Sequence, residues 1–178
     1  SHPAGDFNPR WSPNGAQLYF LSTRSGSSQV WRLDMAGGEA TQVTDLPLDA
    51  ANLTLSPDGS HLAVSVEVFV DCATLACTAE RLDGRGADAA TGRVFDGLFV
   101  RHWDTWEDGR RSHIVVMPVG GGTPVDVMAG VDGDSPSVPF GGAEEFAFAP
   151  DGRAVVLTAR VVGAGEPWST NFDLWLGP

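Results

Sequence analysis

The sequence has no lysine, a single tyrosine and only two cysteines among its 178 residues. All 11 basic residues are arginine, and 23 aspartates and glutamates outnumber them, so the formal net charge is −12. Proteins that bind nucleic acid rely on basic side chains to release counterions from the phosphates. The charge balance therefore disfavours nucleic acid as a partner, whereas a cationic partner or substrate terminus is compatible with it.

Long apolar runs are also absent. No stretch approaches the roughly 20 apolar residues that a membrane-spanning helix needs, so we expect no membrane span. The hydrophobic fraction of 42% is ordinary for a globular domain with a core. The 22 glycines and 12 prolines, together with few helical patterns, favour many short strands joined by turns.

One four-residue turn occurs three times along the chain. Proline sets φ for the first corner of such a turn, and Asn or Asp followed by Gly tolerates the reversal. Each copy precedes an apolar run at the same offset, and a turn that returns in front of a strand indicates a structural repeat. The copies are Ser12-Pro13-Asn14-Gly15, Ser56-Pro57-Asp58-Gly59 and Ala149-Pro150-Asp151-Gly152.

The first repeat predicts four antiparallel strands in about 40 residues, which is typical of a β-propeller blade. We expect no strand over residues 1–7, and strands at residues 9–11, 18–22, 29–34 and 40–44. The second repeat predicts strands at residues 51–55, 61–68, 112–118 and 123–128. Between its second and third strands lies an insertion of about residues 69–111.

The third repeat predicts strands at residues 144–148, 154–161 and 171–176, after which the sequence stops where a hairpin to a fourth strand should begin. We therefore predict an all-β fold, a partial β-propeller of about two and three-quarter blades. The blades span about residues 8–45, 51–128 and 143–178 of one domain. Propellers usually need at least four blades to close, so the chain reads as a fragment, whose exposed strand edges favour self-association.

The insertion and the segments after it carry a family resemblance. The motifs are Arg101-His102-Trp103-Asp104-Thr105-Trp106, Asp108-Gly109-Arg110-Arg111-Ser112-His113, and the stretches at residues 136–142 and 145–148. They resemble the propeller of acylaminoacyl peptidases and type-V dipeptidyl peptidases, in the prolyl oligopeptidase family of serine peptidases. The repeated turns alone also resemble those of TolB-type propellers. A TolB-like, non-enzymatic propeller that mediates protein–protein interaction is thus the alternative.

The peptidase resemblance implies a two-domain enzyme, in which a propeller covers an α/β-hydrolase domain and restricts access to short peptides. The Gly-x-Ser-x-Gly motif of the nucleophile is missing from this sequence. We therefore expect no catalytic residue in the chain itself. Its partners would be short peptides, the hydrolase domain and the remaining blades.

The resemblance also implies where substrate binds. Related dipeptidyl peptidases hold the free amino group of the substrate with propeller carboxylates, a role that suits Asp104 or Glu107. Trp103 and Trp106 would line an apolar pocket or give a cation–π face, and Arg101 would hold a peptide carboxylate. In the alternative, the tryptophans pack the insertion against the blade and Arg101 pairs with Asp104. The substrate-binding candidates are Arg101, His102, Trp103, Asp104, Trp106 and Glu107.

Cys72 and Cys77 are close enough in sequence for a local disulfide, which would place the protein in the periplasm or outside the cell. Two free thiols of a cytosolic enzyme are the alternative. A short helix is expected over residues 73–82. Neither the four histidines nor the acidic loop Asp132-Gly133-Asp134 has the spacing of metal ligands, so no metal and no cofactor is expected.

Overall fold

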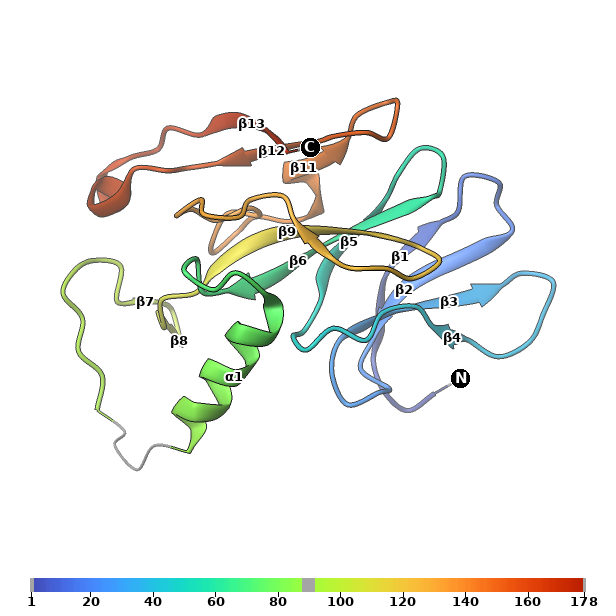
Figure 1. Cartoon of the computed structure of the whole chain (residues 1–178), viewed down its shortest axis with the longest axis horizontal. Coiled ribbons are helices and arrows are strands. Elements are labelled where there is room, and N and C mark those ends of the chain that lie inside the picture. The colour runs from blue at the N-terminus through green and yellow to red at the C-terminus, as the bar shows by residue number, and fades with distance from the viewer. Residues whose placement is uncertain (1, 88–91, 178) are drawn as a thin grey trace.

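The computed structural model describes residues 2–87 and 92–177. Over these residues it contains two four-stranded sheets, one three-stranded sheet and a two-stranded hairpin (Figure 1). All the strand pairs are antiparallel. The predicted all-β fold with four-stranded antiparallel sheets is confirmed, whereas the number and ranges of the blades stay predictions.

The three large sheets follow one another along the chain and are named here in that order. Sheet 1 consists of β1 (Asp6–Trp11), β2 (Gln17–Ser22), β3 (Gln29–Asp34) and β4 (Thr41–Gln42). Sheet 2 consists of β5 (Ala51–Leu55), β6 (His61–Val68), β9 (Arg111–Pro118) and β10 (Val125–Asp126). Sheet 3 consists of β11 (Phe146–Phe148), β12 (Val155–Ala159) and β13 (Asp173–Gly177).

The first strand begins earlier than the sequence indicates. Residues 1–7 were expected to carry no strand, but β1 begins at Asp6, which pairs with Ser22 of β2. The register shifts between Phe7 and Arg10, and Asn8 in between has a φ of +53°. This irregularity hides the strand, because it breaks the alternation of polar and apolar residues that marks a regular strand.

The repeated turns pack against each other in sequence order. A Cβ atom placed on Gly59 would lie 2.9 Å from Cδ of Pro13, and one on Gly152 would lie 3.7 Å from Oδ1 of Asp58. Gly59 has a φ of +72°, a conformation that favours glycine. The turns therefore form a row along one edge of the molecule, where each closes its own hairpin and touches its neighbour.

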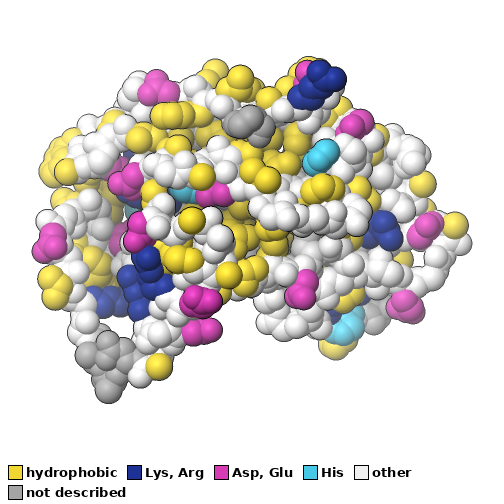
Figure 2. Space-filling model, in the orientation of Figure 1, with side chains coloured by type: hydrophobic (Ala, Val, Ile, Leu, Met, Phe, Trp, Pro, Cys, Tyr) yellow, Lys and Arg dark blue, Asp and Glu magenta, His cyan; other side chains and the backbone are white. Residues whose placement is uncertain are grey.

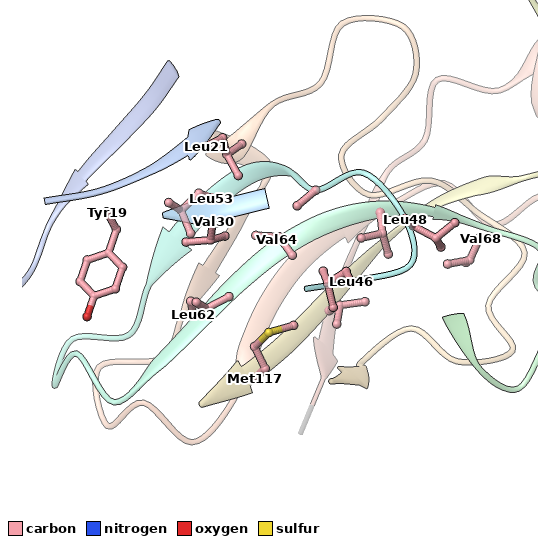
Figure 3. Packing of buried hydrophobic residues seen from close by; sticks show 13 residues of the cluster. Tyr19, Leu21, Val30, Leu46, Leu48, Leu53, Leu62, Val64, Val68 and Met117 are labelled. Carbon is pink, nitrogen blue, oxygen red and sulfur yellow. The ribbon is translucent and has the colours of Figure 1, made fainter. Parts of the chain in front are cut away.

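The core lies between successive sheets. In Figure 3, Tyr19, Leu21 and Val30 of sheet 1 face Leu62 and Val64 of sheet 2. The opposite face of sheet 2 packs on sheet 3 in a second apolar cluster, which joins Ala63 and Ile114 to Val155, Leu157 and Ala159. Alternate residues of β6 thus face different neighbours, as expected for a strand whose side chains alternate between two covered faces.

The insertion begins after Val68 and ends before Arg111, close to the predicted limits of residues 69–111. It contains α1 (Leu75–Gly86) and the hairpin of β7 (Arg101–His102) and β8 (Thr105–Trp106). The helix starts after Thr74, whose side chain caps it by accepting a hydrogen bond from the Cys77 amide. It ends beyond the predicted range of residues 73–82.

A disulfide joins Cys72, which precedes this helix, to Cys77 in its first turn. Thr78 is fully buried, and its Oγ1 accepts a hydrogen bond from the Phe69 amide at 3.2 Å. These contacts fix the helix to the end of β6. None of the helices within the described ranges is long and apolar enough to cross a membrane.

Candidate functional site

The insertion lies at the edge of the molecule opposite the row of repeated turns (Figure 1). When antiparallel strands follow one another along the chain, successive connections alternate between the two ends of the strands. The turn after the first strand of each sheet therefore lies at one end, and the connection after the second strand lies at the other end. Three long segments meet there, and their described residues are 69–87 with 92–110, 129–142 and 160–172.

A cavity of about 1040 Å³ lies at this edge. Figure 2 shows arginine and acidic side chains gathered on this part of the surface. Most of the lining comes from the insertion, and Asp132, Asp134 and Glu166 are added by the other two segments. Of the six predicted substrate-binding residues, His102 and Glu107 line the cavity, whereas the other four lie outside its lining.

The β7–β8 hairpin places His102 and Glu107 side by side. His102 pairs with Thr105 across the hairpin, and the Glu107 amide donates a hydrogen bond to the Val100 carbonyl at 3.1 Å. The His102 Nδ1 lies 3.0 Å from Oε1 of Glu107. Their side chains are 18% and 31% exposed. The carboxylate is thus held from one side and remains accessible from the cavity, so it can accept hydrogen bonds from a cationic ligand.

The two tryptophans of the hairpin, Trp103 and Trp106, are exposed. Trp103, with a φ of +47°, is 69% exposed and meets the Phe140 ring edge-on at 5.2 Å. Trp106 is 48% exposed, stacks on Phe95 at 5.7 Å and has the Arg101 guanidinium over its ring at 5.5 Å. Neither tryptophan is buried against sheet 2, contrary to the packing alternative.

Arg101 and Asp104 form no ion pair in the part of the chain that the structure describes. That element of the packing alternative is also wrong. The Arg101 side chain lies over an aromatic ring instead, where the ring face attracts the cation.

Arg111 lines the cavity and binds acidic residues of the two connections at residues 129–142 and 160–172. Its Nε lies 2.8 Å from Oδ1 of Asp132, and its Nη1 lies 2.9 Å from Oδ2 of Asp134 and 3.1 Å from Oε2 of Glu166. Arg160 binds the other oxygen of Glu166 at 3.1 Å. Burial disfavours the charge of Arg111, but the carboxylates, above all Asp134, outweigh it and raise the pKa of the guanidinium.

This network was not predicted from the sequence. Asp132-Gly133-Asp134 was interpreted as a plain acidic loop, yet both carboxylates bind Arg111. Glu166, in the short helix η2 (Gly163–Trp168), was not singled out. The sequence offers only a weak clue, because residues 129–142 carry two acidic residues and no basic one, whereas residues 160–172 carry one arginine and one glutamate.

Two carboxyl groups beside this network have pKa values above their ordinary range. For Glu67, near the end of β6, partial loss of hydration beside the neighbouring protein groups is the main cause, followed by the charge of Asp134. For Asp134, burial raises the pKa and outweighs the hydrogen bond that its Oδ1 accepts from the Ser112 amide at 2.8 Å. Negative charge is therefore crowded on this side of the site.

Another buried polar pair lies in sheet 2, away from the cavity. The fully buried His113 has its Nδ1 2.8 Å from Oδ2 of Asp126 and its Nε2 2.9 Å from the Val131 carbonyl. Both ring nitrogens are thus occupied by contacts that fix β10 and the following loop to β9. Within residues 2–87 and 92–177, no group of three or more His, Cys, Asp or Glu side chains is arranged to hold a metal ion.

Comparisons with known proteins give relatives that match almost the whole chain, although no family model matches it. The chain is 26% identical over 176 residues to dipeptidyl-peptidase 5 of Porphyromonas gingivalis. This match covers 97% of this chain and 25% of the relative. The acylaminoacyl peptidase structure from Pyrococcus horikoshii superposes with a TM-score of 0.59 at 15% identity, covering 97% of this chain and 23% of that one. The resemblance to dipeptidyl and acylaminoacyl peptidases is confirmed.

The chain spans about a quarter of the length of these peptidase relatives. The structural match shows a shared fold, and the sequence match extends across the insertion because it covers nearly the whole chain. A shorter match links the chain to a TolB homologue of Chlorobium chlorochromatii, at 39% identity over 49 residues, or 28% of this chain. That length is about one repeat.

Proposed function

We propose that this chain is the non-catalytic propeller portion of an exported serine peptidase of the dipeptidyl, acylaminoacyl or oligopeptidase type. It gates and helps to bind short peptides for an α/β-hydrolase domain elsewhere in the same polypeptide. The observation that carries the proposal is the cavity of about 1040 Å³ that the insertion builds, with His102 and Glu107 in its lining. The peptidase relatives, which match over the insertion as well, support it.

Glu107 is the residue that fits an amine anchor. Its carboxylate faces the cavity and is partly shielded from water, which strengthens a charge-assisted hydrogen bond to an ammonium group. His102 holds one carboxylate oxygen in place at 3.0 Å. Asp104, the other carboxylate predicted for this role, lies outside the cavity lining, so the structure favours Glu107.

The charges around the cavity suit the same ligand. The chain has a net charge of −12, and the six acidic side chains that line the cavity outnumber its four arginines. Such a field attracts cations and raises their local concentration. A peptide with a free amino terminus would therefore enter with its charged end toward Glu107. The disulfide between Cys72 and Cys77 supports a periplasmic or secreted location.

The second candidate function is that of a TolB-like propeller that binds other proteins, which the match to a TolB homologue over 49 residues favours. One experiment separates the two functions. The full polypeptide that contains this chain is treated with a fluorophosphonate probe, which labels the nucleophile of serine hydrolases, and is assayed with dipeptidyl coumarylamides. We expect labelling outside these 178 residues and release of dipeptides. An unlabelled and inactive polypeptide would favour the TolB-like function.

A further inference from the structure

Arg85, near the end of α1, reaches the segment that follows the β7–β8 hairpin. Its Nη1 donates a hydrogen bond of 2.7 Å to the backbone carbonyl of Asp108, 23 residues further along the chain. Hydrogen bonds from a charged donor are shorter and stronger than those between neutral groups. Because Asp108 directly follows Glu107, this bond ties the helix to the peptide unit next to the proposed amine anchor.

The Arg85 guanidinium is itself held in place from another side. Its Cζ lies 4.5 Å from the centroid of the Phe69 ring. Phe69 is buried, and its amide donates a hydrogen bond to the Thr78 side chain in α1. A planar guanidinium that stacks on a ring holds its N–H groups in a fixed direction, which an ammonium on a flexible stem does not. Arg85 therefore joins the segment after the hairpin to a ring that is fixed in the core.

The hairpin depends on support of this kind. Its two strands form two residue pairs, Arg101 with Trp106 and His102 with Thr105. A two-stranded hairpin is marginally stable at best when it stands alone. Glu107 directly follows β8, so the direction of its side chain depends on contacts made outside the hairpin.

A compact turn carries the contact of Arg85 to Glu107. The Asp108 carboxylate accepts hydrogen bonds from the Arg110 amide at 3.1 Å and from Arg110 Nε at 2.8 Å. Gly109 between them has a φ of +86°. A turn closed by its own side chain is locally rigid. A shift of the Asp108 carbonyl would therefore move the adjoining backbone of Glu107 as well.

We infer that Arg85 is a positioning residue for the amine anchor: it holds the Asp108 carbonyl and thereby keeps the Glu107 carboxylate directed into the cavity. Arg85 also lines the cavity, but the role assigned to it requires no contact with substrate. The inference rests on the proposed function, because it needs Glu107 to bind the peptide amine. It adds to the site a residue from a different element, whose contribution can be separated from that of Glu107.

Arg81 provides a matched control on the same helix. It lies one turn before Arg85, and its Cζ is 4.6 Å from the centroid of the same Phe69 ring. Its two Nη atoms bind the carboxylate of Asp71, which precedes α1, at 2.7 and 2.9 Å. Arg81→Gln therefore removes an arginine from the same helix and the same ring but leaves the bond to Asp108 in place.

Steady-state kinetics of the full polypeptide test the inference through a double-mutant cycle of Arg85→Gln and Glu107→Gln. For a dipeptidyl substrate with a free amino group, Arg85→Gln should raise KM about three- to tenfold, the effect of losing one hydrogen bond, with little change in kcat. Arg81→Gln should leave KM unchanged. Because Arg85 acts through Glu107, Arg85→Gln should change KM by less than about twofold in the Glu107→Gln background.

The cycle separates failure of the inference from failure of the proposed function. A raised KM in Glu107→Gln with an unchanged KM in Arg85→Gln would leave the proposed function intact and overturn the role of Arg85. Multiplicative effects of the two changes would also overturn it, because Arg85 would then act on the substrate independently of Glu107. An unchanged KM in Glu107→Gln would contradict the proposed function, and the inference with it.

Hydrogen exchange of the full polypeptide gives a readout that does not depend on activity. The amides of Glu107 and Arg110 are hydrogen-bonded in the folded chain, to the Val100 carbonyl and the Asp108 carboxylate. In Arg85→Gln these amides should exchange faster, whereas Arg81→Gln should leave their exchange unchanged. Exchange that is as slow in Arg85→Gln as in the wild type would show that the hairpin segment does not depend on Arg85, and it would overturn the inference.

Discussion

Arg111 and Glu166 lie 55 residues apart in sequence, yet Nη1 of the arginine is 3.1 Å from Oε2 of the glutamate. Arg111 begins the third strand of sheet 2, and Glu166 belongs to the connection between β12 and β13 of sheet 3. Their side chains are only 21% and 14% exposed. The ion pair therefore fastens two neighbouring sheets together at the edge where the cavity lies.

Replacing Arg111 should destabilise the protein markedly. Arg111→Gln leaves three carboxylates without their shared cation, and breaking a buried ion pair from one side costs about 3 kcal/mol. Urea denaturation measures the loss. Arg81→Gln is the control, because the Arg81–Asp71 pair lies on the surface, with side chains 35% and 74% exposed, where solvent screens such pairs and they contribute little to stability. Equal losses in the two variants would contradict the role given to Arg111.

The row of turns gives a second prediction, based on two glycines. Gly15 and Gly59 have φ values of +67° and +72°, but a Cβ on Gly15 meets nothing within 4 Å, whereas one on Gly59 meets Pro13 at 2.9 Å. Both alanine variants should lose about 1–2 kcal/mol from the left-handed backbone. Gly59→Ala should lose about 1 kcal/mol more. Thermal denaturation compares them, and an equal loss would show that the turns do not pack on each other.

Neutralising Glu67 should stabilise the protein at neutral pH. Its pKa is raised in the folded state, so ionisation disfavours folding. The cost is absent below the unfolded pKa of about 4.3 and grows as pH rises through the folded pKa. Glu67→Gln should therefore raise the melting temperature at pH 7 and have little effect at pH 3. The gain should stay below about 1 kcal/mol, because the Glu67 side chain is only partly covered by protein and solvent still screens its charge.

Glu80→Gln is the matched control for this pH series, because it removes the same charge from an exposed position of α1. Melting curves of both variants are recorded across the pH range. A Glu67→Gln gain that persists unchanged at pH 3 would mean that ionisation of Glu67 is not its cause.

The disulfide should contribute to stability through the unfolded chain. Changing both Cys72 and Cys77 to Ser removes a short covalent loop, which in the chain-entropy account costs about 2 kcal/mol. Reduction of the wild type should give a similar loss, and guanidinium denaturation measures both. A purified protein that reacts with a thiol reagent before reduction would contradict the disulfide.

Much of the fold was predictable because its signals are local. The turns at Pro13, Pro57 and Pro150 set the repeat, and their uneven spacing located the insertion between β6 and β9. Proline and Asn-Gly or Asp-Gly act within four residues, so the turns were identified from sequence alone. The start of β1 was missed since the irregularity at Asn8 breaks its pattern.

The site was only partly predictable. The motif led to His102 and Glu107, which line the cavity, but also to Trp103 and Asp104, which do not. A motif marks a segment, whereas the orientation of each side chain depends on the hairpin that carries it. The contacts of Arg111 join residues up to 55 positions apart. Local sequence patterns do not predict a pairing over that separation.

Steady-state kinetics of Glu107→Gln, made in the full polypeptide, test the central claim most directly. Asp104→Asn is the control, because it removes a carboxylate from the same hairpin outside the cavity lining. For a dipeptidyl substrate with a free amino group, Glu107→Gln should raise KM at least about tenfold, the effect of losing one charge-assisted hydrogen bond. Asp104→Asn should leave KM unchanged. An unchanged KM in the Glu107→Gln enzyme would contradict the assignment of this cavity to the peptide amine.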